Sequence, residues 1–221
     1  MVDIEKYIGH LIDMLKTRFG ERLLYVGLQG SYLRGEANDN SDIDIMVVID
    51  DLSISDLSGY RTVIESMDHF DKSCGFICSK SDLLNWNSLE ICHLLHSTRD
   101  YFGVLSDFVP EYCDEDVRNY VKLSLNNLYH EICHSYIHAD SMTNISGLRL
   151  AYKGVFFIIQ NLHYLSSGIF PSTKSELLSL ISGKNYDVLK RSVDISSGAE
   201  FDFDDSFELL FSWCRETLKT L

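Results

Sequence analysis

Two aspartates separated by one residue, Asp42 and Asp44, stand at the start of an apolar run that covers residues 45–49. Such a run predicts a buried β-strand. Because residues i and i+2 of a strand point to the same face, we expect the two carboxylates to project together from one strand edge. Carboxylate oxygens and the oxygens of a substrate phosphate are the ligands that Mg²⁺ prefers. The spacing therefore predicts that Asp42 and Asp44 are metal ligands.

A Gly-Ser turn, Gly30-Ser31, precedes the aspartates and offers a place for a phosphate. Glycine has no side chain, so the backbone N–H groups beside it can approach phosphate oxygens closely. The Ser31 hydroxyl could donate to a terminal phosphate or simply cap a helix. Arg34, just after the turn, could meet phosphate oxygens or lie on the surface at a helix start. The turn and the two carboxylates together suggest metal-assisted transfer from a nucleoside triphosphate.

These residues resemble the signature of the nucleotidyltransferase superfamily, which includes DNA polymerase beta and the antibiotic nucleotidyltransferases. The signature is a hydrophobic residue, Gly-Ser, a spacer and Asp-x-Asp entering a strand; here it reads Leu28-Gln29-Gly30-Ser31 and Asp42-Ile43-Asp44. Arg34-Gly35 and Ser41 fit it as well. The close likeness covers residues 23–50. A looser likeness to stand-alone bacterial antibiotic-type nucleotidyltransferases, which carry a helical second domain, runs along the whole chain.

The resemblance implies a Mg²⁺-dependent enzyme that transfers a nucleoside monophosphate, AMP from ATP, to a hydroxyl group and releases pyrophosphate. The acceptor that it implies is a small molecule similar to an aminoglycoside or lincosamide antibiotic. A protein hydroxyl, as in nucleotidyltransferase antitoxins, is the alternative, and a degenerate protein that only binds nucleotide is another. Gly30, Ser31 and Arg34 would bind the nucleotide, and Lys153, in a later helical pattern, would bind its triphosphate.

The family completes its metal site with a third carboxylate near the start of the next strand, and there this chain departs from the pattern. Cys74 occupies that position, in the segment 73–79. A thiol is a poor ligand for Mg²⁺. Asp71 could substitute if the strand register shifts, and Glu90, on the following helix, is a second candidate for the ligand or catalytic base. The other possibilities are that the base comes from the helical half of the chain or that catalysis is lost.

The composition limits the partners of the chain. Its 221 residues carry a formal net charge of −14, which argues against an extended nucleic-acid surface, because such a surface is basic. A few local cations and a metal ion can still hold one anionic substrate, and the acidic charge mildly favours cationic acceptors.

No apolar run reaches membrane length, the N-terminus does not resemble a signal peptide, and the six scattered cysteines suggest free thiols. We therefore expect a cytoplasmic protein without a membrane partner.

Hydrophobic periodicity divides the chain into two domains, residues 1–108 and 109–221. Helix and strand patterns alternate in the first, which predicts an α/β nucleotidyltransferase domain with a short mixed sheet. The second is helical throughout, so the fold class is α+β followed by an all-α helical bundle. The expected strands are 23–28, 43–49, 75–79 and 101–105, and the expected helices are 4–20, 55–67, 83–96, 114–139, 145–167, 174–181, 186–193 and 204–218.

One further motif, from His130 through Glu131 to His134, matches the H-E-x-x-H pattern of zinc hydrolases. A catalytic zinc needs a third protein ligand, which the residues after the motif do not supply. His138 continues the row, but three side chains along one straight helix cannot surround a single ion. A zinc hydrolase is therefore a remote alternative, and the sequence favours an amphipathic helix with a histidine face.

Overall fold

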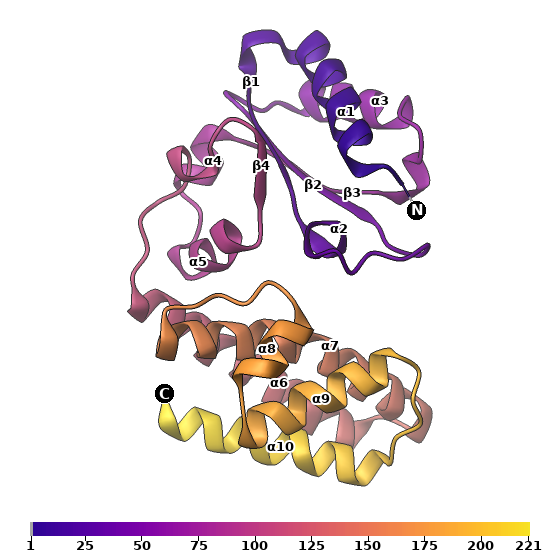
Figure 1. Ribbon diagram of the computed structural model, residues 1–221, viewed down its shortest axis with the longest axis vertical. Helices are drawn as coiled ribbons and strands as arrows, with labels where there is room; N and C mark the ends of the chain where they lie inside the picture. The colour runs from indigo at the N-terminus through magenta and orange to yellow at the C-terminus, as the bar shows by residue number, and fades with distance from the viewer. Residues whose placement is uncertain (1) are drawn as a thin grey trace. The chain divides into compact units, whose positions relative to one another are not determined.

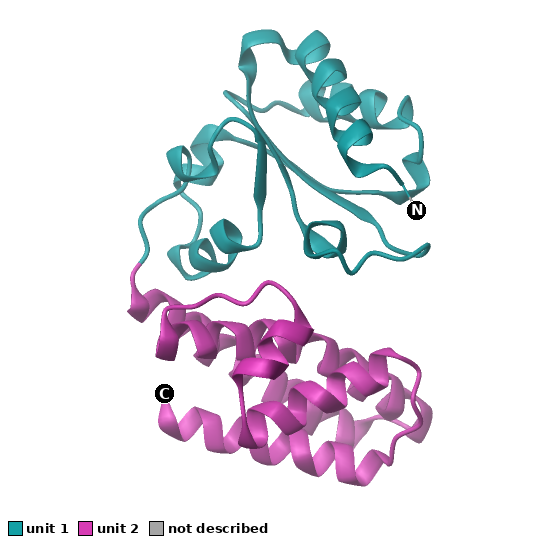
Figure 2. Ribbon diagram, viewed as in Figure 1, with its two compact units in different colours: residues 1–112 teal, residues 113–221 magenta. Residues whose placement is uncertain are grey.

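The structure, a computed structural model, describes residues 2–221. The chain forms two compact units, residues 1–112 and 113–221, which Figure 2 colours separately. The division follows Tyr112, a few residues beyond the predicted one after residue 108. Within the described residues, no helix is both long enough and apolar enough to cross a membrane.

The first unit is built on a four-stranded sheet with the strand order β3-β2-β1-β4 (Figure 1). β2 pairs in parallel with β3, whereas β1 runs antiparallel to β2 and β4, so the sheet is mixed as predicted. The strands are β1 (Leu23–Leu28), β2 (Ile43–Ile49), β3 (Ser73–Ser79) and β4 (Arg99–Phe102). The helices are α1 (Ile4–Phe19), α2 (Gly30–Arg34), α3 (Ile54–Glu65), α4 (Lys80–Leu84) and α5 (Ser88–His96).

Strand β2 has a hydrophobic core on each of its faces. Ile43, Ile45 and Val47 belong to the core shared with α1 and α3, whereas Met46 and Val48 belong to the core shared with α4 and α5. Figure 1 shows these two pairs of helices on opposite sides of the sheet. This alternation follows from the period of a strand. The face of β2 that packs against α4 and α5 begins with one polar residue, Asp44.

The second unit consists of helices around a core of its own. They are α6 (Asp114–His138), α7 (Ser141–Ser167), α8 (Lys174–Leu180), α9 (Gly183–Ser196) and α10 (Phe203–Thr220). Trp213, Tyr152 and Phe156 are the largest side chains in this core, each at most 2% exposed. A mixed α/β unit followed by a helical one confirms the predicted fold class.

Beyond shifts of a few residues at element ends, three differences from the prediction concern the first unit. The Gly-Ser turn is the first turn of the short helix α2. The helix expected over 83–96 is divided into α4 and α5, because the side chain of Asn87 caps a new helix by accepting the N–H of Leu89 at 3.1 Å. The last strand is 99–102 instead of 101–105, since Gly103 turns the chain with a φ of 75°.

Candidate active site

The site lies at the edge of the sheet where β1 ends and β2 begins. Gly30, the first residue of α2, packs against the Asp44 carboxylate so closely that a Cβ on Gly30 would lie 1.9 Å from Oδ2 of Asp44. Its φ of 68° is in the left-handed region, which glycine adopts without steric cost. The Gly-Ser segment and the Asp-x-Asp segment, separate in the sequence, therefore meet directly in the first unit.

Gln29 fixes the start of α2 beside Asp44. Its backbone N–H donates to the carbonyl oxygen of Asp44 at 2.9 Å, which extends the pairing of β1 with β2 by one bond. Its side chain donates to the hydroxyl of Thr98 at 2.8 Å, just before β4. Three segments are thus tied together at one sheet edge, and sequence patterns alone identified neither Gln29 nor Thr98.

The two predicted metal ligands lie near one another, although only one belongs to the strand. β2 begins at Ile43, so Asp42 precedes it and is exposed, whereas Asp44 is half-buried within it. Burial raises the pKa of Asp44, and the neighbouring charge of Asp42 raises it further. A hydrogen bond from Cys74 and the positive charge of Arg34 act in the opposite direction. A divalent cation would relieve the repulsion between the two carboxylates.

Cys74 is the direct neighbour of Asp44 in the parallel pairing of β2 with β3. Its thiol is hydrogen-bonded to the Asp44 carboxylate. Burial raises the pKa of this thiol, and Asp44 raises it further, so that the neutral S–H form is favoured. The strand position that the resemblance assigns to an acid therefore lies beside the metal-ligand candidate but carries a thiol.

The two substitute carboxylates, Asp71 and Glu90, have different surroundings. Asp71 is exposed in the single 3₁₀ turn that leads into β3. Glu90 accepts a hydrogen bond from the indole N–H of Trp86 at 2.6 Å, and Trp86 stacks on Phe76 with ring centroids 6.1 Å apart. Phe76 follows Cys74 by two residues on β3 and so points to the same face of the sheet. No group of three or more His, Cys, Asp or Glu side chains within residues 2–221 is arranged to hold a metal ion.

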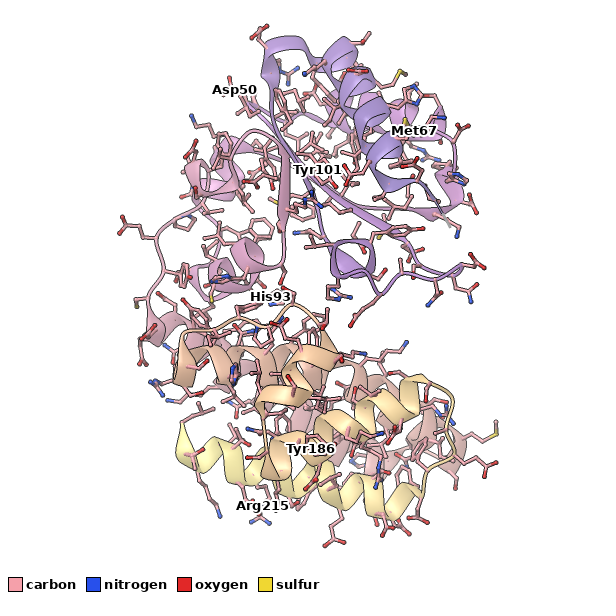
Figure 3. The ribbon with its side chains drawn as sticks, in the orientation of Figure 1. Asp50, Met67, His93, Tyr101, Tyr186 and Arg215 are labelled. Atoms are coloured by element: carbon pink, nitrogen blue, oxygen red, sulfur yellow. The ribbon has the colours of Figure 1, made fainter. Side chains whose placement is uncertain are left out.

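Arg34, at the end of α2, has an electrostatic effect on Asp44 and on a histidine that no sequence pattern indicated. Its Nε donates to Oε2 of Glu36 at 3.0 Å, and its charge also acts on Asp44 and on His93. Burial, followed by the positive charge of Arg34 and by repulsion from His96 when that ring is protonated, lowers the pKa of His93 to about 4. His93 lies on α5, where Figure 3 labels it. It is therefore neutral at pH 7, and only the tertiary structure brings it near Arg34.

The other predicted residues lie on two different units. Ser31 is half-buried in the first turn of α2, where its hydroxyl has no hydrogen-bond partner among residues 2–221. Lys153 is exposed on α7 of the second unit, with no ion pair to any described residue. His130, Glu131 and His134 are exposed on α6. Their assigned roles remain predictions.

The donor set fits a divalent cation and the phosphates of a nucleotide. Two nearby carboxylates supply hard oxygen ligands, and the absence of a side chain at Gly30 leaves the Asp44 carboxylate bordered only by backbone on that side. Asp42 and Asp44 would hold Mg²⁺. Ser31 and Arg34 carry donors that phosphate oxygens accept.

The comparisons with known proteins agree with this geometry. Residues 9–73 match the family model of the nucleotidyltransferase domain, a span that includes Gly30, Asp42 and Asp44 and ends one residue before Cys74. No curated protein matches the sequence.

Two solved structures are similar to the chain. The spectinomycin adenyltransferase AAD(9) from Enterococcus faecialis, in a crystal structure with ATP and spectinomycin, is 14% identical with a TM-score of 0.58, and the likeness covers 97% of this chain and 99% of that chain. A toxin-antitoxin structure with AMP-PNP is 20% identical with a TM-score of 0.35, covering 64% and 99%. The first likeness shows a shared fold along the chain, whereas the second is too slight to support an argument.

Proposed function

We propose that this chain, a nucleotidyltransferase, transfers AMP from ATP to a hydroxyl group of a small cationic molecule of the aminoglycoside type, with Mg²⁺ and with release of pyrophosphate. The observation that carries the proposal is the contact between Gly30 and the Asp44 carboxylate, beside Asp42. It brings the turn that we propose to bind phosphate next to the carboxylates that we propose to bind the metal. The matched nucleotidyltransferase domain supports the reaction type.

A small-molecule acceptor is supported by the fold and by the charge. The adenyltransferase that shares the fold along the whole chain was crystallised with spectinomycin. The net charge of −14 favours a cationic acceptor over an anionic one such as a nucleic acid. A lincosamide-like acceptor is the nearest variation on the same proposal.

The chain's own residues would act by positioning and by charge. Mg²⁺, when bound, supplies Lewis-acid neutralisation of phosphate charge. Asp42 and Asp44 would hold it, and Asp44 belongs to a strand whose two faces are packed in hydrophobic cores, which fixes the position of that carboxylate. Ser31 and Arg34 would orient the phosphates from the first unit itself. Such preorganised contacts lower the barrier because they need no reorganisation during the reaction.

The acceptor hydroxyl needs a base, and we assign this role to Glu90 before Asp71. Glu90 is held by Trp86, which stacks over the face of β3 that also carries Cys74. Asp71 is exposed in a turn before the strand. General-base help is worth about 10²–10⁴-fold in rate. Glu90→Gln should therefore reduce turnover severely, whereas Asp71→Asn should reduce it little.

The test is pyrophosphate release from MgATP across a panel that contains spectinomycin, other aminoglycosides and lincosamides. We expect release with at least one acceptor, whose mass increases by one AMP, and no release in Asp42→Asn or Asp44→Asn. Release that is unchanged in Asp44→Asn would contradict the proposed site.

The alternative, a degenerate protein that binds nucleotide without catalysing transfer, rests on one specific observation. That observation is the thiol of Cys74 beside Asp44. A wild-type protein that binds MgATP but releases no pyrophosphate with any acceptor, and that gains activity as Cys74→Asp, would establish that alternative. Release only when a protein partner is added would instead identify a protein hydroxyl as the acceptor.

A further inference from the structure

Three histidines form a row on the surface of the second unit. His130, His134 and His138 follow one another at intervals of four residues along α6, and all three are exposed. The ring centroids of His134 and His138 are 4.8 Å apart, and those of His130 and His134 are 6.0 Å apart. The row borders a shallow surface depression lined by His130, Glu131, His134, Ser135, His138, Ala139 and Thr143.

The surroundings of this row favour a cation. Glu131 supplies a carboxylate, and neither lysine nor arginine lines the depression. α6 ends at His138, so the last histidine pair lies at the negative end of the helix dipole, where positive charge is stabilised. Imidazole nitrogens are suitable ligands for Zn²⁺, Ni²⁺ and Cu²⁺, whereas Mg²⁺ prefers oxygen.

We propose that His134 and His138 chelate one divalent transition-metal ion, with water completing the coordination, and that His130 is an alternative partner for His134. Side chains four residues apart lie on the same helix face, so one ion can contact both rings. Because no three ligands within the described residues converge, the ion is held by two protein ligands and exchanges readily. The bound ion would hold the last turn of α6 in its helical conformation. The site is not a hydrolytic centre, because a catalytic zinc needs a third protein ligand.

The sharing of His134 by both pairs gives the proposal a distinctive signature. One ion should bind per chain, because His134 can serve only one pair at a time. His134→Ala removes both pairs and should abolish binding. His138→Ala leaves the wider pair and should weaken binding, whereas His130→Ala leaves the closer pair and should change it little.

The experiment is calorimetric titration of the full-length protein with Ni²⁺ in excess Mg²⁺, which competes for carboxylate ligands but not for imidazole. Proton NMR in the same samples should show that Ni²⁺ broadens the imidazole signals that disappear in His134→Ala and His138→Ala. The matched control is His10→Ala, because His10 is exposed on a helix, α1, without a histidine four residues away. It should bind Ni²⁺ like the wild type.

Undiminished Ni²⁺ binding in His134→Ala, or an equal loss in His10→Ala, would overturn the proposal. Binding of two ions per chain that both depend on this row would contradict the shared ligand. The inference is independent of nucleotide transfer: Asp44→Asn should keep its Ni²⁺ site even though it loses MgATP binding.

Discussion

At the scale of single residues, the site combines groups that are unfavourable for folding but useful for binding charge. Asp44 is half-buried beside Asp42, and burial raises its pKa. A carboxyl group whose pKa is higher in the native state than in the unfolded chain contributes stability at low pH, and this contribution is lost as the pH rises through the native pKa. The ionised form needed to bind a metal is therefore the form that folding disfavours.

The first prediction follows from this pH dependence of the contribution of Asp44 to stability. Asp44→Asn should melt at or above the wild-type temperature at pH 7, because the amide avoids the cost of a buried charge, and the difference should vanish in acid. The same variant should lose Mg²⁺-dependent ATP binding. Thermal unfolding over a range of pH and calorimetry with MgATP measure the two effects. Asp13→Asn, at an exposed position on α1, is the control and should change neither. A lower melting temperature for Asp44→Asn at pH 7 would contradict the assignment.

Gly30 provides the second prediction, with a closely matched control. Gly30 and Gly35 both adopt a φ of 68°, but a Cβ at Gly30 would meet the Asp44 carboxylate whereas a Cβ at Gly35 would meet nothing within 4 Å. Each alanine variant should cost about 1–2 kcal/mol for the left-handed backbone. Only Gly30→Ala should also displace the carboxylate, so it alone should lose MgATP affinity. Equal MgATP affinity in the two variants would show that the contact has no role in binding.

At the scale of elements, caps and ion pairs determine where helices begin. α3 starts with a capping box in which the Ser53 hydroxyl accepts the N–H of Asp56 and the Asp56 carboxylate accepts the N–H of Ser53. Arg22, just before β1, donates from Nη1 and Nη2 to the two oxygens of Asp56 at 3.0 and 2.9 Å. One carboxylate thus joins the start of β1 to the start of α3, which follows β2.

The third prediction concerns this pair. The hydrogen bonds from Arg22, followed by those from Ser53, hold the pKa of Asp56 well below its usual range. A lowered carboxyl pKa contributes stability above the unfolded pKa of about 3.9, and this is lost as the pH falls through the native pKa. Arg22→Gln should therefore lower the melting temperature at pH 7, and the deficit should shrink below about pH 4.

The control for this pair is Arg61→Gln. Arg61 and Glu65 form an exposed ion pair within one helix turn of α3, with side chains 76% and 43% exposed, and such pairs contribute little. Its melting temperature should stay near that of the wild type at every pH. A pH-independent deficit in Arg22→Gln would mean that Arg22 acts through packing and not through the Asp56 charge.

At the scale of the whole molecule, each unit has a hydrophobic core of its own. Residues 113–221 bury Trp213, whose indole N–H donates to Oδ1 of Asn185 at 2.7 Å. The other tryptophan, Trp86, lies in the first unit and is 37% exposed. The two tryptophans therefore report on different units.

The fourth prediction is that residues 113–221 fold when expressed alone, because one contiguous cluster supplies their core. The fragment should show a helical circular-dichroism spectrum, cooperative thermal unfolding, and blue-shifted fluorescence from Trp213. The control is Trp213→Phe in the full-length chain, which should lose the blue-shifted component and keep the emission of Trp86. A fragment that unfolds without cooperativity would show that its core depends on the first unit.

The sequence by itself determined the fold class and most of the element ranges, and it predicted that the carboxylate pair and the Gly-Ser turn belong to one site. These features depend on local periodicity and on spacing within a few residues, which the chain carries directly. The tertiary structure decided the rest. The pairing of Asp44 with Cys74 depends on strand register, the neutral state of His93 on burial and on Arg34, and the position of Gln29 beside Thr98 on the order of strands in the sheet. Such contacts join segments far apart in the chain, and local spacing contains no information about how those segments approach one another.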